Sequence, residues 1–91
     1  MFYKVASVDP LPAYMLRVEF QNGKTKYFDV SQLFEKWEAF KDLRDVPGLF
    51  GLVHVDAGGY GISWNDSIDL ECCDLWEFGT DTLPDPEKAV L

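Results

Sequence analysis

YMLRVEFQNGKTKYFDV, residues 14–30, holds two alternating apolar and polar runs on either side of an Asn22-Gly23 pair. An Asn-Gly pair between such runs predicts a β-hairpin, because a tight hairpin turn needs positive φ angles that Gly adopts without strain and Asn tolerates. The alternation assigns one face of each strand to the protein interior. This hairpin is therefore expected to be the nucleus of a β-sheet.

The register of the hairpin depends on the length of its loop. A two-residue loop at Asn22-Gly23 sets Glu19 opposite Lys26, so that opposite charges face each other. A three-residue loop that ends in a bulge at Gly23 shifts the pairing, and both registers stay open at this stage. In the two-residue register the shared apolar face consists of Leu16, Val18, Phe20 and Tyr27.

The segments on either side of the hairpin predict a strand before it and a helix after it. Residues 3–8 predict a short first strand, which the prolines of Asp9-Pro10-Leu11-Pro12 are expected to end. From Ser31 the apolar period changes from that of a strand to that of an amphipathic helix. The apolar face of this helix consists of Leu33, Phe34, Trp37 and Phe40.

The second half of the chain predicts another hairpin. A strand starting near Leu49 or Phe50 runs to Gly58-Gly59 and returns over residues 60–64, followed by a turn, a short extended piece at 68–71 and a last helical turn at 72–78. The predicted fold class is α+β, with two layers in which antiparallel hairpins of about five strands pack on one main helix. The order is βββαββ with a short C-terminal helical turn. We place one α+β domain at residues 1–78 and an acidic, proline-containing tail at residues 79–91.

Length and composition bound the class of protein. A chain of 91 residues, 47% hydrophobic and 15% aromatic, can form one modest core despite its formal net charge of −8. No apolar run approaches the roughly 18 residues of a membrane helix, and the N-terminus lacks the profile of a signal peptide. Cys72 and Cys73 are adjacent, so we expect free thiols in a reducing compartment. These features predict a cytoplasmic protein that does not enter a membrane.

The negative charge is concentrated in the second half of the chain. Residues 1–44 hold seven Lys and Arg against six Asp and Glu, whereas residues 45–91 hold only Lys88 against ten. An acidic surface repels the phosphate backbone, so this domain alone is not expected to bind DNA or RNA directly. A basic protein is the natural partner. The simpler alternative is that the carboxylates only keep a small domain soluble.

No set of residues in the sequence specifies a reaction. His54 is the single histidine, so a Ser-His or Cys-His pair that includes it could not be supplemented by a second histidine. Its predicted place on a strand favours a structural role. Cys72 and Cys73 point apart in an extended chain and do not complete a metal site with it. The carboxylates of residues 66–77 lack the central glycine of a calcium loop. We therefore assign no catalytic residue, no metal and no cofactor, and favour a role other than that of an enzyme.

Several short fragments of the sequence occur in an order and at a spacing that can be compared with those of known protein families. They are the Asn-Gly turn, the Phe28-Asp29-Val30 step, Phe40-x-x-Leu43, Phe50-x-x-Val53 and Trp64-x-x-x-x-Asp69-Leu70. In order and spacing, over residues 3 to about 78, the chain resembles a family of small, mostly bacterial proteins of unknown function, family twenty-four forty-two. The resemblance implies an α+β domain of antiparallel strands and a packed helix. It implies no catalytic residues.

The same resemblance suggests a class of partner. Members of this family are suspected to be the antitoxin half of toxin-antitoxin pairs, beside a second small protein. Some longer members carry a helix-turn-helix domain after this one. This chain departs from them because it ends at Leu91, so a DNA-binding role does not transfer.

Three functional hypotheses follow from the sequence. The first is a protein-interaction domain that binds a small basic partner, an antitoxin-like role, through Asp66, Asp69, Glu71, Asp74, Trp76 and Glu77. The second is a small-ligand or catalytic pocket near His54 and Tyr60. The third is a homo-oligomer formed through an unpaired strand edge, either of residues 3–8 or of the second hairpin.

Overall fold

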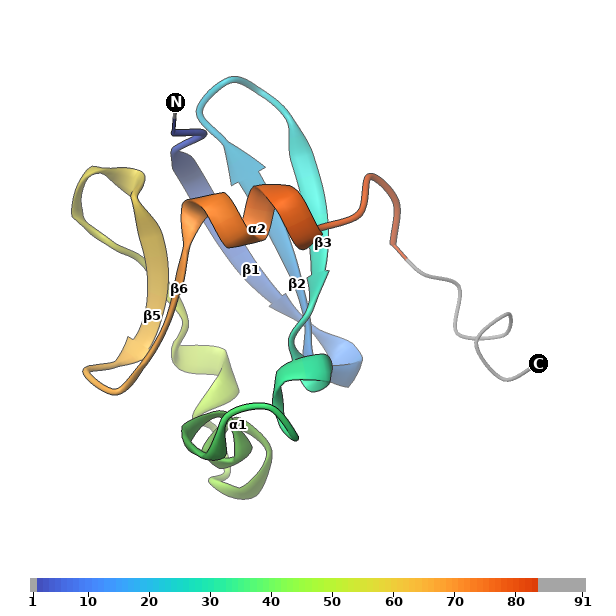
Figure 1. The fold of residues 1–91 in the computed structure, drawn as a ribbon, viewed down its shortest axis with the longest axis vertical. Helices are drawn as coiled ribbons and strands as arrows, with labels where there is room; N and C mark the ends of the chain where they lie inside the picture. The colour runs from blue at the N-terminus through green and yellow to red at the C-terminus, as the bar shows by residue number, and fades with distance from the viewer. Residues whose placement is uncertain (1, 84–91) are drawn as a thin grey trace.

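Two antiparallel sheets of three strands each form the frame of the protein, in the orders β1-β2-β3 and β4-β5-β6. The computed structural model describes residues 2–83. The α+β class is confirmed, with six strands in place of the expected five or so. Helix α2 begins where β6 ends and runs to β3, passing in front of β1 and β2 in the view of Figure 1. The elements are β1 (Val5–Leu11), β2 (Met15–Phe20), β3 (Thr25–Asp29), α1 (Asp42–Asp45), β4 (His54–Val55), β5 (Gly61–Asn65), β6 (Ile68–Glu71) and α2 (Cys72–Phe78).

The central hairpin, β2 and β3, forms with a three-residue loop. The amide of Phe20 donates to the Lys24 carbonyl at 2.8 Å, and Gly23 has a φ of +91°, the left-handed conformation of a bulge glycine. Glu19 consequently pairs with Thr25, so the register expected for a two-residue loop is wrong and the three-residue alternative is correct.

This shift exchanges two aromatic residues between the faces of the sheet. Phe28 lies opposite Leu16 and is 3% exposed, whereas Tyr27 lies opposite Arg17 on the other face. Because side chains alternate along a strand, a shift of one residue moves the whole of β3 from one face to the other. Leu16, Val18 and Phe20 are buried as expected. The prediction that Tyr27 shares their face is wrong.

Strand β1 is longer than its sequence suggests. It continues through Pro10, which lies opposite Leu16, and ends at Leu11. Proline cannot donate to a ladder, but it is tolerated where its nitrogen faces away from the neighbouring strand. Because β1 is an outer strand of its sheet, Pro10 does not end it, and the strand ends instead directly before Pro12, where a 3-10 turn begins.

The long amphipathic helix expected after the central hairpin does not form. Short 3-10 turns at Val30–Leu33 and Glu38–Lys41 take its place, and Trp37 between them has the extended angles φ −131° and ψ 125°. Leu33, Phe34 and Phe40 are buried nonetheless, whereas Trp37 is 45% exposed. Apolar spacing over so few residues fits successive turns as well as it fits a helix, and tertiary packing decides between them.

The main helix of the fold is α2, where only a helical turn was expected. Leu75 is fully buried and Cys72 is 1% exposed. The indole of Trp76 stacks on the Tyr3 ring with centroids 3.8 Å apart, and it meets the Phe20 ring edge-on. The helix thus closes the core, whose largest fully buried side chains are Phe20, Leu16, Leu43, Ile62, Ile68 and Leu75.

In the second sheet, the turn between β5 and β6 is the feature that best matches the prediction from the sequence. The Asn65 side chain accepts hydrogen bonds from the backbone amides of Ser67 and Ile68 at 2.8 and 3.0 Å, which confirms the turn between β5 and β6. The incoming strand is much shorter than expected, because residues 50–52 form a 3-10 turn and β4 is only His54–Val55.

The segment after α2 makes backbone contacts with the first sheet. Thr80 exchanges two hydrogen bonds with Tyr27, at 2.8 and 2.7 Å, and the Asp81 carboxylate pairs with the Lys24 ammonium at 3.2 Å. Thr80 and Asp81, at the start of the predicted tail, thus lie beside β3 and its hairpin loop. Residues 84–91 of that prediction lie outside the described residues.

Candidate interaction surface

Strand β6 carries two of the predicted partner-binding carboxylates. Asp69 and Glu71 are two residues apart and therefore share one face of the strand, and both are exposed. Leu70 between them is 5% exposed and belongs to the core. The alternation of the strand thus separates a carboxylate face from an apolar face.

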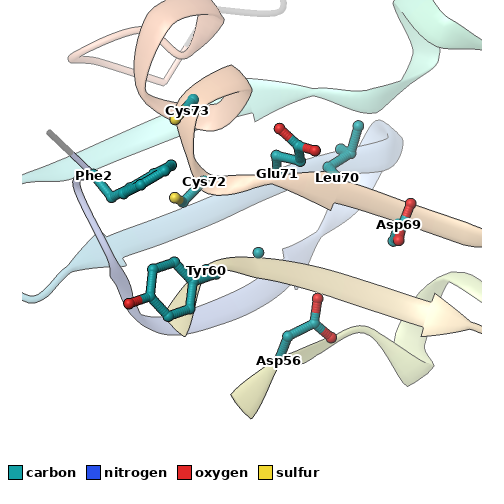
Figure 2. A pocket seen from close by; sticks show the side chains of 9 residues that line it. Phe2, Asp56, Tyr60, Asp69, Leu70, Glu71, Cys72 and Cys73 are labelled. Atoms are coloured by element: carbon teal, nitrogen blue, oxygen red, sulfur yellow. The ribbon is translucent and has the colours of Figure 1, made fainter. Parts of the chain in front are cut away.

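One hollow lies beside the start of β5 and α2, and Figure 2 shows it from close by. Its volume is about 390 Å³, and Tyr60, Phe2, Asp56 and the two cysteines contribute to its lining together with β6. The ring of Phe2 meets the Tyr60 ring edge-on at 5.6 Å. We call this the Tyr60 hollow.

Two further hollows adjoin on the side of β6 that meets the 3-10 turns. Their volumes are about 430 and 230 Å³, and they share Trp37, Leu70 and Asp74. We call the pair the Trp37 groove. Its first part includes Asp69, Glu71 and Phe40, and its second part includes Phe28 and Phe78.

The Trp37 groove combines exposed aromatic rings with negative charge. Trp37 is 45% exposed and Phe78 is 61% exposed, although both are large apolar side chains. Among residues 2–83, no ion pair involves Asp69, Glu71 or Asp74. The ammonium of Lys36 lies 5.3 Å from the centroid of a Trp37 ring and is the cation at the groove. Carboxylates without a paired cation attract a basic ligand.

The structure brings together three of the six predicted partner-binding residues, Asp69, Glu71 and Asp74, at one hollow. Asp66 lies in the β5–β6 turn and Glu77 is exposed on α2. Trp76 is half-buried, stacked on Tyr3 and 4.5 Å below the Lys26 ammonium. Its ring is thus held in intramolecular contacts.

Sequence reasoning missed Trp37 and Phe78 as surface residues. Trp37 was assigned to the buried face of a helix that does not form, and Phe78 was taken as an apolar anchor of the last turn. The signal at Trp37 is its immediate surroundings, because Glu35, Lys36 and Glu38 are all charged. At Phe78 we find no comparable signal.

His54 does not join the groups that were expected to surround it. It is exposed, and its Nδ1 lies 3.2 Å from the Leu52 carbonyl oxygen. It does not line the Tyr60 hollow. The Ser63 hydroxyl, opposite His54 across the strands, donates to the Asp56 carboxylate at 2.7 Å. This arrangement has a serine bound to a carboxylate, without the intervening base that nucleophilic catalysis uses.

The cysteine thiols differ in their surroundings. Cys72 is 1% exposed, and this burial raises the pKa of its thiol, with a further rise from the neighbouring Cys73. Within residues 2–83, no three His, Cys, Asp or Glu side chains are grouped so that they could hold a metal ion. In the same part of the chain, no helix has both the length and the apolar character needed to cross a membrane.

The fold and the surface define a small α+β domain in which a helix spans two antiparallel sheets and an acidic groove lies beside the strand β6. The family described as Protein of unknown function (DUF2442) matches residues 5–80, and the chain belongs to this family. The match runs from the first residue of β1 to Thr80, the residue that pairs with Tyr27. No curated protein and no solved structure matches the chain. The resemblance found in the sequence is thus confirmed at the level of the family.

Proposed function

We propose that this chain is a non-enzymatic interaction domain that binds a small basic protein at the Trp37 groove. One observation carries the proposal: Asp69, Glu71 and Asp74 border the same hollow as the exposed Trp37. An exposed apolar patch rimmed by polar groups is typical of a surface that binds another protein. The spread of acidic residues along the sequence predicted the sign of the charge, and the groove supplies the apolar contact.

The two kinds of side chain have separate roles in this proposal. Tryptophan is enriched among the residues that dominate binding energy, because a large ring buries much apolar area at little entropic cost. The carboxylates guide a basic partner toward the groove and disfavour acidic ones. Asp66 and Glu77 extend the negative field, and the anchoring role passes from Trp76 to Trp37.

The partner in this proposal is a small basic protein encoded beside the chain. The family resemblance motivates this part, because members of the family are suspected antitoxins that neutralise a neighbouring small protein. Both proteins then act in the bacterial cytoplasm. An antitoxin needs only to cover its partner, which is compatible with a domain for which we assign no catalytic residue.

Coexpression of the two proteins, followed by size-exclusion chromatography and calorimetry, tests the proposal. We expect co-elution at micromolar concentration and an affinity that falls as salt is raised. Asp69→Lys with Asp74→Lys should weaken binding at least tenfold. The control is Glu35→Lys with Asp42→Lys, which makes the same change in net charge at exposed positions outside the groove.

A second pair of variants separates the apolar contact from charge. Trp37→Ala should weaken binding at least tenfold, whereas Leu52→Ala removes a side chain that is 62% exposed elsewhere and should leave binding unchanged. Equal affinities for the groove variants and their controls would remove the groove as the binding site. Separate elution of the two wild-type proteins would remove this partner.

A further inference from the structure

The outer edges of the two sheets differ in what lies beside them. At β3 the outer edge is occupied by Thr80, which exchanges backbone hydrogen bonds with Tyr27. Strands β1 and β4, at one side of each sheet, contact each other. Strand β6 is the remaining outer strand. Among residues 2–83 it has β5 as its one strand partner.

The ladder between β5 and β6 determines which backbone groups of β6 face outward. In an antiparallel pair, opposite residues alternate between those that exchange hydrogen bonds and those that do not. The Cys72 amide donates to the Tyr60 carbonyl at 2.9 Å, so this pair of residues is of the hydrogen-bonded kind. Leu70 is two residues before Cys72 and lies opposite Ile62, so its amide group also points toward β5. The amide groups of Asp69 and Glu71 therefore point away from β5.

Asp69, Leu70 and Glu71, which carry or flank these outward groups, line the first part of the Trp37 groove. That hollow is lined by β6 on one side and by the segment from Trp37 to Phe40 on the other. Its volume of about 430 Å³ is of the size of a ligand pocket.

We propose that β6 receives an extended segment of the basic partner as an additional strand, in which basic and apolar residues alternate. This inference rests on the proposed function and adds the manner of binding. Main-chain hydrogen bonds to a sheet edge give affinity, and alternate side chains give specificity. In the part of the chain that the structure describes, this edge of β6 has no second strand beside it, which is a feature of the tertiary structure.

The alternation of side chains follows from the two faces of β6. Residues directly opposite Asp69 and Glu71 lie on the carboxylate face, where Lys or Arg pairs with them. The residues between these lie on the face of Leu70, beside Trp37 and Phe40, and are therefore apolar. A second copy of this chain is a poor occupant, because it would set the same carboxylates against each other, a known means of protecting sheet edges.

Amide hydrogen exchange on the wild-type protein tests the inference directly. The probe is a synthetic hexapeptide of alternating Lys and Val with blocked ends. Its control is the same peptide with every backbone nitrogen methylated, which keeps the charge and removes all the backbone donors. With the Lys-Val peptide we expect exchange of the Asp69 and Glu71 amides to slow at least tenfold, and with the N-methylated peptide no change. Slow exchange of both amides in the free protein would overturn the inference, because the edge is then already occupied by the chain's own residues or by a second copy.

Two substitutions at one position separate the backbone donor from the charge. Asp69→Asn removes the carboxylate and keeps the amide N–H, whereas Asp69→Pro removes both. Because this N–H points away from β5, the proline breaks no ladder bond, and the preceding Ile68 is already extended as proline requires. We expect Asp69→Pro to bind the Lys-Val peptide at least tenfold more weakly than Asp69→Asn. A thermal melt of each variant shows whether the fold is intact.

The outcomes distinguish this inference from the proposed function. If the basic protein binds the wild-type chain and Asp69→Lys weakens it, but Asp69→Pro and Asp69→Asn bind equally well, strand addition is wrong and the groove still binds its partner. If the groove variants bind the partner as well as wild type does, the proposed function fails. Protection of the Asp69 and Glu71 amides by the Lys-Val peptide would still support strand addition in that case. Should Asp69→Pro not fold, the exchange experiment on the wild-type protein decides.

Discussion

The ammonium of Lys26 lies 4.5 Å from the centroid of a Trp76 ring and donates a 2.6 Å hydrogen bond to the Trp76 backbone carbonyl. One side chain of β3 thereby contacts both the ring and the backbone of α2. The helix also follows directly from β6 in the other sheet. This contact therefore helps to hold the two sheets in place across the helix, and with them the position of the Trp37 groove.

Removing the Lys26 ammonium should destabilise the protein. We expect Lys26→Met to lower the free energy of unfolding by about 1–2 kcal/mol, because a cation–π contact and a charge-assisted hydrogen bond are both lost. Lys24→Met is the control, since its exposed pair with Asp81 should contribute less than about 1 kcal/mol. Urea denaturation of both variants measures the difference. Equal losses would show that the Lys26 contact to α2 contributes nothing specific.

Two glycines with similar backbone angles should respond differently to alanine. Gly59 has a φ of +81°, and a Cβ there would lie 2.5 Å from the Val5 carbonyl oxygen. Gly48 has a φ of +82°, but a Cβ there would have no neighbour within 4 Å. Gly48→Ala should cost only the conformational penalty of about 1 kcal/mol. Gly59→Ala should cost about 3 kcal/mol, because the backbone of β1 must also move. Similar melting temperatures for the two variants would contradict the close approach.

Substitution of two apolar residues of α2 should affect stability at one position and partner binding at the other. Leu75 is fully buried, so Leu75→Ala should lower the free energy of unfolding by about 2–5 kcal/mol. Phe78 is 61% exposed at the groove, and Phe78→Ala should change stability by less than about 0.5 kcal/mol. Calorimetry with the basic partner should show weaker binding for Phe78→Ala. Unaltered affinity would place Phe78 outside the interface.

Stability should fall at alkaline pH through Cys72. Burial, with Cys73 as a neighbour, raises the pKa of the Cys72 thiol in the folded protein. The unfolded chain loses this proton at about pH 8.5, while the folded protein still keeps it. The contribution to stability is therefore full below the unfolded-state pKa and is lost as the pH rises through the folded pKa. Denaturation between pH 7 and pH 10 should show this loss in wild type and a flatter profile in Cys72→Ala.

The two thiols should also differ in reactivity in the native state. Iodoacetamide at pH 8 should modify the half-buried Cys73 before the buried Cys72, because the thiolate is the reacting form and burial restricts access. Mass spectrometry of peptic peptides distinguishes the two positions. Faster modification of Cys72 would show that the start of α2 opens readily.

Local patterns predicted the elements whose formation depends on neighbouring residues. The central hairpin, the turn at Asn65 and the extended piece at β6 all form, because turn chemistry and alternation act within a few residues. The helix expected over residues 31–40 does not form. Its apolar spacing was satisfied by two 3-10 turns, since the burial of Phe34 and Phe40 depends on where the sheets lie.

The candidate site divides in the same way. The sequence indicated Asp69, Glu71 and Asp74 from the concentration of acidic residues, and the structure places these three at one hollow. The amino-acid sequence did not indicate that Trp37 or Phe78 is exposed, because exposure depends on contacts between segments far apart in the chain. Whether these residues bind a partner is decided by the variants described above.

The amino-acid sequence alone determined the α+β class, the family and the sign of the surface charge, because composition, turn residues and alternation are properties of the chain itself. Tertiary packing decided the register of β3, the choice of α2 as the main helix and, within residues 2–83, the edge of β6 that has no second strand partner. A loop longer by one residue reverses the faces of a strand. A strand edge is paired or open only with respect to segments that arrive from elsewhere in the chain. These relationships depend on the assembled core and could not be derived from neighbouring residues.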